Sequence, residues 1–206
     1  MKEEQRQNMS VYNATPSRYD AKYKESFEKY GKPDAERFVS MLNGPKILDV
    51  GCGPGHFLEF FREKELDALG IDLSDGFIQI CSSKGLNVRK MDLEEPLLYP
   101  YSFDGIFANM SLLHLPRERV QRAVDKLARL LKPNGLFFVA VKEGTKQGME
   151  VDDENPPHQR WMTYFTDEEM KSFFAKKFDV VWETKFVLPS GNVRLKYLFR
   201  LKPVSK

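Results

Sequence analysis

The amino-acid sequence predicts an α/β domain in which helices cover both faces of a mostly parallel sheet. Short apolar runs alternate with helical patterns between residues 46 and 141, and this alternation is typical of a parallel sheet. Residues 136–141 are apolar without interruption, as expected of a strand that is buried on both faces. The chain has 206 residues, and at roughly 100–200 residues per domain this length corresponds to a single domain.

The N-terminal part, residues 1–44, is predicted to be a helical cap. Residues 1–14 are polar, and we expect them to be loosely held at the end of the chain. Aromatic residues recur at helical spacing across residues 15–30, and a second short helix is expected over 34–42. The recurring aromatic residues are Tyr19, Tyr23, Phe27 and Tyr30.

The central part, residues 45–142, is predicted to hold the parallel strands and the helices between them. The strands are expected at 46–50, 69–72, 88–91, 103–108 and 136–141. The helices are expected at 57–61, 75–84 and 117–131, and a turn at 132–135 precedes the last strand.

The C-terminal part departs from this alternation. Residues 143–165 form a long connection, and connections of this length are often functional loops. Within residues 166–206, a capping box at 166–169 begins a helix. The runs 179–188 and 193–201 flank a Pro-Ser-Gly-Asn turn and are predicted to pair as an antiparallel hairpin. Because apolar residues alternate with mostly basic ones in the second arm, we expect one of its faces to be exposed to water.

Composition excludes several classes of protein. Lys and Arg number 32 against 30 Asp and Glu, and a net charge of +2 gives no support to polyanion binding. Two cysteines without a CxxC motif and three widely separated histidines predict no disulfide framework and no metal site. No apolar run approaches the roughly 18 residues of a membrane helix, and the first residues have no apolar leader. We therefore expect a cytoplasmic protein that does not enter a membrane.

A glycine-rich turn carries the strongest functional signal. Gly51, Gly53 and Gly55 follow a predicted strand and precede a helix, where glycine lets a ligand approach the backbone and the helix start offers free N–H groups. Asp72 ends the next strand, where a carboxylate can accept hydrogen bonds from both hydroxyls of a ribose. The pattern predicts a nucleotide-type ligand, and the alternative is a plain βα turn with a chance acidic residue.

The glycine spacing disfavours a dinucleotide. A Gly-x-Gly-x-x-Gly fingerprint would need a third glycine at position 56 or 58, and these positions hold His56 and Leu58. No P-loop motif occurs in the sequence.

Five segments in order resemble class I S-adenosylmethionine-dependent methyltransferases. The resemblance extends over about residues 18–200, and it implies a Rossmann-like three-layer sandwich whose seven-stranded, mostly parallel sheet ends in an antiparallel hairpin. It implies S-adenosylmethionine as cofactor and S-adenosylhomocysteine as product. The segments are ILDVGCGPG at 47–55, GIDLS at 70–74, MDL at 91–93, FDGIFAN at 103–109 and LLKPNG at 130–135.

The resemblance assigns one group of residues to the methionine end of the cofactor. The backbone of Gly51, Cys52 and Gly53 should lie along the methionine moiety. Asp49 should orient that loop or meet the amino group through water, and Asn109 should lie near the amino-acid end. For Cys52 a redox role is the alternative, and a small side chain in a tight turn is the simpler interpretation.

A second group is assigned to the adenosine end. Asp72 should hold the ribose and Leu73 should pack on adenine. Asp92 and Leu93 should bracket the edge of the base. Tyr19 resembles an N-terminal lid residue that closes over the cofactor.

Acceptor-side candidates lie beyond the carboxyl ends of the strands, where active sites of open α/β sheets are found. His114 could act as a general base, or it could cap a helix or bond a loop carbonyl. In the acceptor-side loop 143–165, Arg160 could clamp an anionic acceptor, and Tyr164 could wall an apolar pocket with Trp161. Alternatively, Trp161 joins the loop to the core, and Arg160 pairs with an acidic residue at 152–154. Tyr12 is a weaker candidate for the same pocket.

These observations predict direct, in-line methyl transfer to a small-molecule acceptor by a monomer or homodimer, with catalysis by positioning. The alternative is a tRNA methyltransferase, because the chain also resembles enzymes that act on wobble-uridine carboxymethyl groups. A non-catalytic cofactor-binding protein is a further alternative. In the tRNA alternative, a phosphate track would consist of Arg194, Lys196, Arg200 and Lys202.

Overall fold

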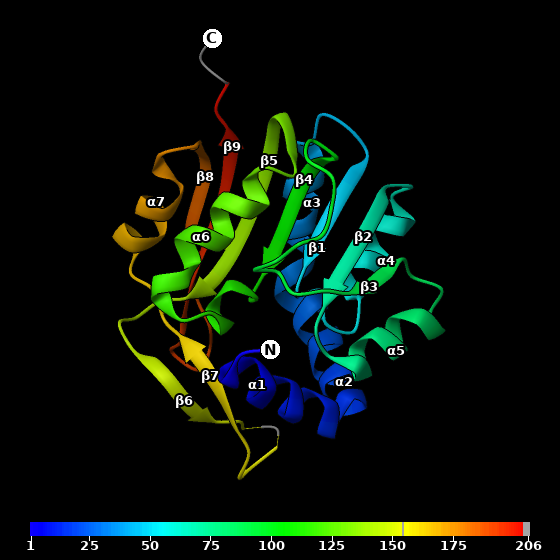
Figure 1. Ribbon diagram of the computed structural model, residues 1–206, viewed down its shortest axis with the longest axis vertical. Helices are drawn as coiled ribbons and strands as arrows, with labels where there is room; N and C mark the ends of the chain where they lie inside the picture. Colours follow the sequence, from blue (N-terminus) through cyan, green and yellow to red (C-terminus); the bar gives the residue numbers. More distant parts are fainter. Residues whose placement is uncertain (154, 204–206) are drawn as a thin grey trace.

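A seven-stranded sheet forms the centre of the molecule (Figure 1). The computed structural model describes residues 1–153 and 155–203. Glu154 and residues 204–206, the end of the predicted C-terminal part, lie outside the described residues. Along the sheet the strands follow the order β3-β2-β1-β4-β5-β9-β8, and β1 to β5 are parallel. β9 runs antiparallel to both β5 and β8, so the predicted C-terminal hairpin is confirmed. The strands are β1 (Lys46–Val50), β2 (Asp67–Asp72), β3 (Val88–Lys90), β4 (Phe103–Asn109), β5 (Leu131–Lys142), β8 (Phe178–Val187) and β9 (Val193–Leu201).

Helices cover both faces of this sheet, as a three-layer sandwich requires. On one face, Leu48 and Val50 of β1 belong to a core with α6 (Arg117–Ala128) and α7 (Asp167–Ala175). On the other face, Ile47 of the same strand packs with α3 (Lys32–Ser40) and α4 (His56–Glu63), and α5 (Asp75–Ser83) follows beside β3. Adjacent residues of one strand therefore enter opposite cores, so both faces of the sheet are covered. This arrangement, together with the strand order, confirms the predicted Rossmann-like fold.

The predicted helices form close to their expected bounds. α2 runs over Pro16–Ser26 and continues as a π-helical turn, Phe27–Gly31, directly into α3. The capping box of α7 is confirmed: the Thr166 hydroxyl accepts from the Glu169 N–H at 3.2 Å, and the Glu169 carboxylate accepts from the Thr166 N–H at 2.8 Å. The predicted turn at 132–135 is instead part of β5, where the pairing with β4 shifts register.

The first residues of the chain contradict the expectation of a loose end. They form α1 (Glu3–Ala14), in which Gln5, Asn8 and Val11 are buried. The polar first half of this segment conceals the helix, because distant hydrogen bonds stabilise Gln5 and Asn8, while Val11 packs in an apolar cluster with Tyr19 and Phe77. Asn8, for example, accepts from the backbone N–H of Trp161 at 2.6 Å.

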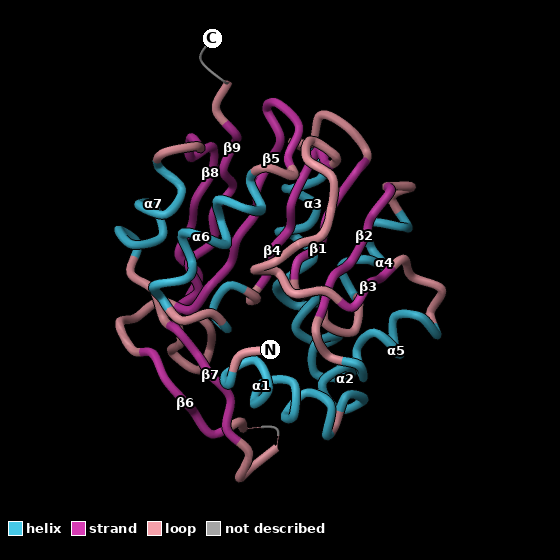
Figure 2. Tube along the Cα trace, viewed as in Figure 1, coloured by secondary structure: helices cyan, strands magenta, loops and turns pink. Residues whose placement is uncertain are grey.

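The long connection at 143–165 also differs from the expected irregular loop. It contains two antiparallel strands, β6 (Gln147–Val151) and β7 (Gln159–Thr163), and α1 packs against β7. Figure 2 shows this small sheet and α1 together at one end of the molecule, beyond the carboxyl ends of the parallel strands.

The prediction that one face of β9 is exposed to water is wrong for its centre. Leu195 to Phe199 are all buried, because helices cover both faces there. Lys196 is only 5% exposed and forms an ion pair with Asp34 of α3 at 2.7 Å. Within residues 1–153 and 155–203, no helix combines the length and apolar character needed to cross a membrane.

Candidate cofactor and acceptor site

A cavity of about 530 Å³ lies at the carboxyl ends of the parallel strands, where open α/β sheets bind their ligands. α1 contributes Gln5, Asn8, Met9 and Tyr12 to its wall, so the helix that the sequence did not predict lines this cavity. Most of the predicted site residues line the same cavity: Asp49, Gly51, Cys52, Gly53, Asp72, Leu73, Asp92, Leu93, Asn109, His114 and Arg160.

The glycine loop is held close to the sheet by its backbone. The N–H groups of Gly51 and Cys52 donate to the carbonyl of Ile71 at 2.8 and 3.1 Å. Gly51 has a φ of 69°, and a Cβ at this position would lie 2.5 Å from the Cβ of Ser111. A side chain here would therefore both strain the backbone and displace Ser111.

Asp72 ties the same loop to the start of α5. One carboxylate oxygen accepts from the Gly53 N–H at 2.9 Å, and the other accepts from the Ser74 N–H at 2.8 Å. Burial raises the pKa of the Asp72 carboxyl, while these N–H groups oppose that shift. Each oxygen keeps a lone pair for a further donor, such as a ribose hydroxyl.

Asp49 has a buried oxygen that lacks a partner. Its side chain is 1% exposed, and among the described residues Oδ2 makes no hydrogen bond. Burial raises the pKa of the Asp49 carboxyl well above its usual range, and the charge of nearby Asp72 adds to this effect. A buried, unpaired acceptor is unfavourable, so a cationic donor entering the cavity would stabilise it.

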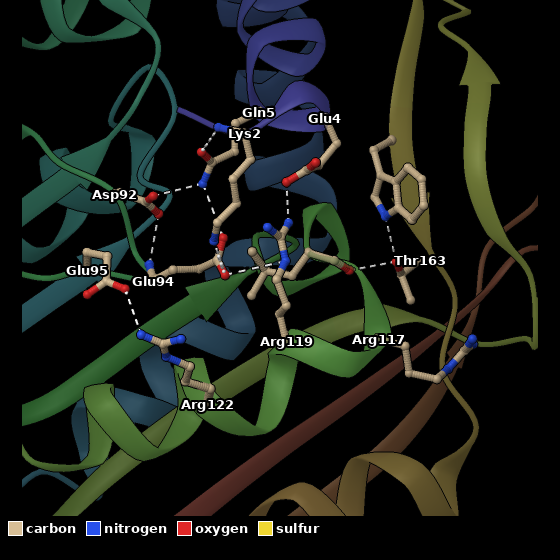
Figure 3. A network of polar contacts seen from close by, with 12 residues as sticks. Lys2, Glu4, Gln5, Asp92, Glu94, Glu95, Arg117, Arg119, Arg122 and Thr163 are labelled. Atoms are coloured by element: carbon tan, nitrogen blue, oxygen red, sulfur yellow. Dashed lines mark hydrogen bonds and ion pairs between the residues drawn. The ribbon is translucent and has the colours of Figure 1, made fainter.

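At the other end of the cavity, an α1 side chain contacts Asp92. The Asp92 carboxylate accepts from Gln5 Nε2 at 2.8 Å and from the Glu94 N–H at 2.9 Å. Figure 3 shows that Gln5 belongs to a network that fastens the start of the chain, in which Lys2 pairs with Glu94 at 2.7 Å. Glu4 pairs with Arg119 of α6 in the same network.

His114 lies in a chain of hydrogen bonds that begins at Arg160. Arg160 Nη1 donates to the Tyr12 hydroxyl at 2.9 Å, and that hydroxyl lies 2.9 Å from His114 Nε2. His114 Nδ1 lies 3.1 Å from the carbonyl oxygen of Trp161, so Nδ1 carries the proton and Nε2 accepts from Tyr12. Burial, together with the charge of Arg160, lowers the pKa of His114 to about 3, so the ring is neutral at physiological pH.

Arg160 pairs with an acidic residue, as one of its two predicted interpretations requires: its Nε lies 2.9 Å from Asp152. Arg160 also lines the cavity, and its predicted role as a clamp for an anionic acceptor stays a prediction. Of the other two acidic candidates, Asp153 lies on the cavity wall and Glu154 lies outside the described residues.

Three of the predicted site residues lie off the cavity wall: Tyr19, Trp161 and Tyr164. Tyr19 is fully buried and donates to Asp152, and Tyr12 and Tyr23 line the cavity near it. Tyr164 donates to Glu150 at 3.0 Å, and burial with this hydrogen bond raises its pKa to about 12. The roles predicted for Tyr19 and Tyr164 therefore remain predictions.

Comparison with known proteins finds similarity to methyltransferases. A family model described as a methyltransferase domain matches residues 47–135. The chain is 31% identical over 133 residues to the tRNA (carboxymethyluridine(34)-5-O)-methyltransferase of Arabidopsis thaliana, covering 64% of this chain and 31% of that protein. It is 34% identical over 106 residues to the ubiquinone biosynthesis O-methyltransferase of Xylella fastidiosa, covering 48% of this chain and 42% of that protein. Together with the fold, these matches support the assignment of the chain to the class I S-adenosylmethionine-dependent methyltransferases, the family that its motifs resemble.

The chain shares its fold with solved methyltransferase structures. The 1,6-didemethyltoxoflavin-N1-methyltransferase of Burkholderia thailandensis, whose structure contains S-adenosylhomocysteine, aligns with a TM-score of 0.69 at 22% identity, covering 92% of this chain and 88% of that one. The chain spans less than half the length of the two curated relatives named above. The predicted cofactor, S-adenosylmethionine, is confirmed as that of the family, and Asp49 and Asp72 offer the acceptors that its amino and ribose groups need.

Sequence reasoning named Tyr12 of α1, which does line the cavity, but it missed three other α1 residues and Lys142. Gln5, Asn8 and Met9 carry no periodic signal that would have placed them on a cavity. Lys142 could have been found, because it directly follows the predicted fifth strand, 136–141, at the edge where ligands of this fold bind. Within residues 1–153 and 155–203, no three His, Cys, Asp or Glu side chains are grouped so as to hold a metal ion.

Proposed function

We propose that this protein transfers a methyl group from S-adenosylmethionine to a small-molecule acceptor. The observation that carries the proposal is the cavity itself, whose wall includes Asp49 and Asp72 as well as a second group, Tyr12, His114 and Arg160, under α1. A cavity of about 530 Å³ is within the usual range for small ligands.

The reaction requires positioning more than it requires chemical groups of the protein. The bound cofactor supplies a methyl group already activated by its sulfonium. Asp72 would hold the ribose and Asp49 would accept from the amino group, which fixes the direction of the methyl. α1 excludes water, and catalysis then comes from holding the acceptor atom in line at roughly 3–3.5 Å.

His114 is proposed to act by positioning in this arrangement. A pKa of about 3 makes the ring a weak base at neutral pH. Nε2 of His114 already accepts from the Tyr12 hydroxyl, so His114 orients the side chain of Tyr12, which lines the cavity. Arg160 and Tyr164 remain proposed acceptor-side residues.

The test is thermal unfolding with S-adenosylmethionine, S-adenosylhomocysteine or NAD, followed by transfer of a labelled methyl group to fractions of a cell extract. A ligand at 100 times its Kd adds about 2.7 kcal/mol, which corresponds to roughly 5–10 °C for a chain of this size. We expect a shift with both adenosyl compounds and label in the small-molecule fraction. Binding without transfer to any fraction would refute the enzymatic proposal and favour a cofactor-binding protein.

A tRNA acceptor is the second candidate, and the identity to the Arabidopsis tRNA methyltransferase is the observation that favours it. The basic residues predicted as a phosphate track argue against it, because several are engaged within the protein. Lys196 pairs with Asp34, and Arg200 donates to the carbonyl of Asn134 at 3.0 Å. Salt-sensitive tRNA binding, with label in the RNA fraction, would establish this candidate instead.

The proposal also includes the cellular setting. Cys52 and Cys81 are buried and free, which supports a reducing compartment such as the cytoplasm. We propose a monomer or a homodimer, which sedimentation at several protein concentrations would decide.

A further inference from the structure

Two basic residues lie opposite each other on the cavity wall, and neither has an ion-pair partner among the described residues. Lys142, the last residue of β5, is paired directly across the antiparallel ladder with Arg194 of β9. Both residues line the cavity. Like charges at opposed positions of two strands are destabilising, so this arrangement needs a reason.

Neither residue forms an ion pair within residues 1–153 and 155–203. Lys142 Nζ donates to the Tyr164 hydroxyl at a long 3.4 Å, and the Arg194 guanidinium lies 5.6 Å from the Tyr30 ring. Arg194 Nε is buried and has no hydrogen-bond partner among the described residues. The acid whose charge acts on Arg194, Asp34, is already paired with Lys196 at 2.7 Å.

The local environment makes both charges unfavourable as they stand. Burial lowers the pKa of Lys142, and Arg160 and Arg194 add to this effect, while Glu150 and Asp153 oppose it. Burial also lowers the pKa of Arg194. An anion bound between them would offset this cost, and a guanidinium with a free N–H presents the fork that carboxylates and phosphates match.

Position within the sheet separates this pair from the cofactor loop. The glycine loop follows β1, and the order β1-β4-β5-β9 places Lys142 two strands away and Arg194 three strands away. At 4.7–4.9 Å per strand, these separations are roughly 10 and 14 Å. The hairpin tip beside the pair also lines the cavity, through Leu188, Ser190 and Asn192.

We propose that Lys142 and Arg194 form an anion site for the acceptor, so that the methylated molecule carries a carboxylate or phosphate group. This inference rests on the proposed function, because it assigns the pair to the acceptor of that reaction. The rest of the wall includes apolar side chains such as Phe57, Met110 and Met162, which suits an acceptor with an apolar body.

The test compares three small probes on wild-type protein saturated with S-adenosylhomocysteine. Benzoate and phenyl phosphate carry the proposed anion, and benzamide is the neutral match for benzoate. Calorimetry or ligand-observed NMR should show that at least one acid binds at least about tenfold more tightly than benzamide. The acid that binds more tightly identifies whether the acceptor carries a carboxylate or a phosphate. Acids that bind no better than benzamide would overturn the proposal.

The variants Lys142→Met and Arg194→Met should each weaken the binding of the acid about tenfold or more, as expected for one lost charge-assisted hydrogen bond. Lys185→Met is the matched control, because Lys185 is exposed and pairs with Glu143, and neither of these residues lines the cavity. Arg194→Lys, which keeps the charge and is less disruptive to folding, should retain more acid affinity than Arg194→Met.

Affinity for S-adenosylhomocysteine, measured first, separates the possible failures. We expect it to stay within twofold in all variants. A loss of cofactor affinity as large as the loss of acid affinity would overturn the proposal, because the pair would then bind the cofactor's own carboxylate. If wild-type protein does not bind S-adenosylhomocysteine at all, the proposed function fails, and the assignment to an acceptor fails with it.

Discussion

Replacing Asp49 with asparagine should have opposite effects on the free protein and on cofactor binding. The side chain is 1% exposed, one oxygen lacks a partner among the described residues, and its pKa is raised by burial. A raised pKa means that the folded state disfavours the ionised carboxyl. Stability is therefore lost as the pH rises from the unfolded pKa, about 3.9, through the folded pKa.

The magnitude follows from the buried charge, because asparagine keeps a polar group at this place and removes only the negative charge. Burying an unpaired charge costs at least about 1–3 kcal/mol, and a chain of this size gains roughly 2–4 °C per kcal/mol. Near pH 7, Asp49→Asn should therefore raise the Tm of the free protein by roughly 2–12 °C. The difference from wild type should shrink as the pH falls towards 4, where the wild-type carboxyl is protonated.

Cofactor binding should change in the other direction. Loss of a charge-assisted hydrogen bond to the cofactor's amino group costs about 1.5–3 kcal/mol, or roughly 10- to 150-fold in Kd. Thermal unfolding from pH 4 to pH 8 and calorimetric titration with S-adenosylhomocysteine measure the two effects separately. A lower Tm together with unchanged affinity would refute the reasoning, because Asp49 would then support the fold and not the ligand.

Three further variants test other parts of the site. Asp72→Ala should weaken cofactor binding by about 1–3 kcal/mol, and unchanged affinity in a titration would remove the ribose assignment. His114→Ala should slow methyl transfer while cofactor affinity stays the same. The folded pKa of His114 is about 3 and its unfolded pKa is near 6.5, so the wild-type protein should lose up to about 1.4 kcal/mol of stability per pH unit as the pH falls below 6.5. The alanine variant should not show this loss. Asn8→Ala should lower the Tm and remove hydrogen-exchange protection from α1, because it leaves the Trp161 N–H unpaired, whereas Ser10→Ala on the exposed side of the same helix should change neither. Retained protection in the Asn8 variant would show that other contacts hold the helix.

Features that depend on short stretches of chain were predictable from the sequence. The glycine turn, the acidic end of β2 and the capping box of α7 each involve residues a few positions apart, so local geometry and hydrogen bonding specify them. The alternation of strands and helices then determined a parallel sheet, because parallel strands need a crossover between them. Ligand-binding residues at the carboxyl ends of those strands follow from the same topology.

Features that depend on contacts between distant residues were decided only by the tertiary structure. α1 is polar in its first half, where its buried face exists because Asn8 meets β7 and Gln5 meets Asp92. The expected loop at 143–165 is a hairpin, and α1 packs against its second strand. Lys142 and Arg194 stand 52 positions apart in the sequence and become neighbours only through the register of β5 and β9. A polar side chain is buried or left unpaired according to what the fold places beside it, and that information is absent from local sequence pattern.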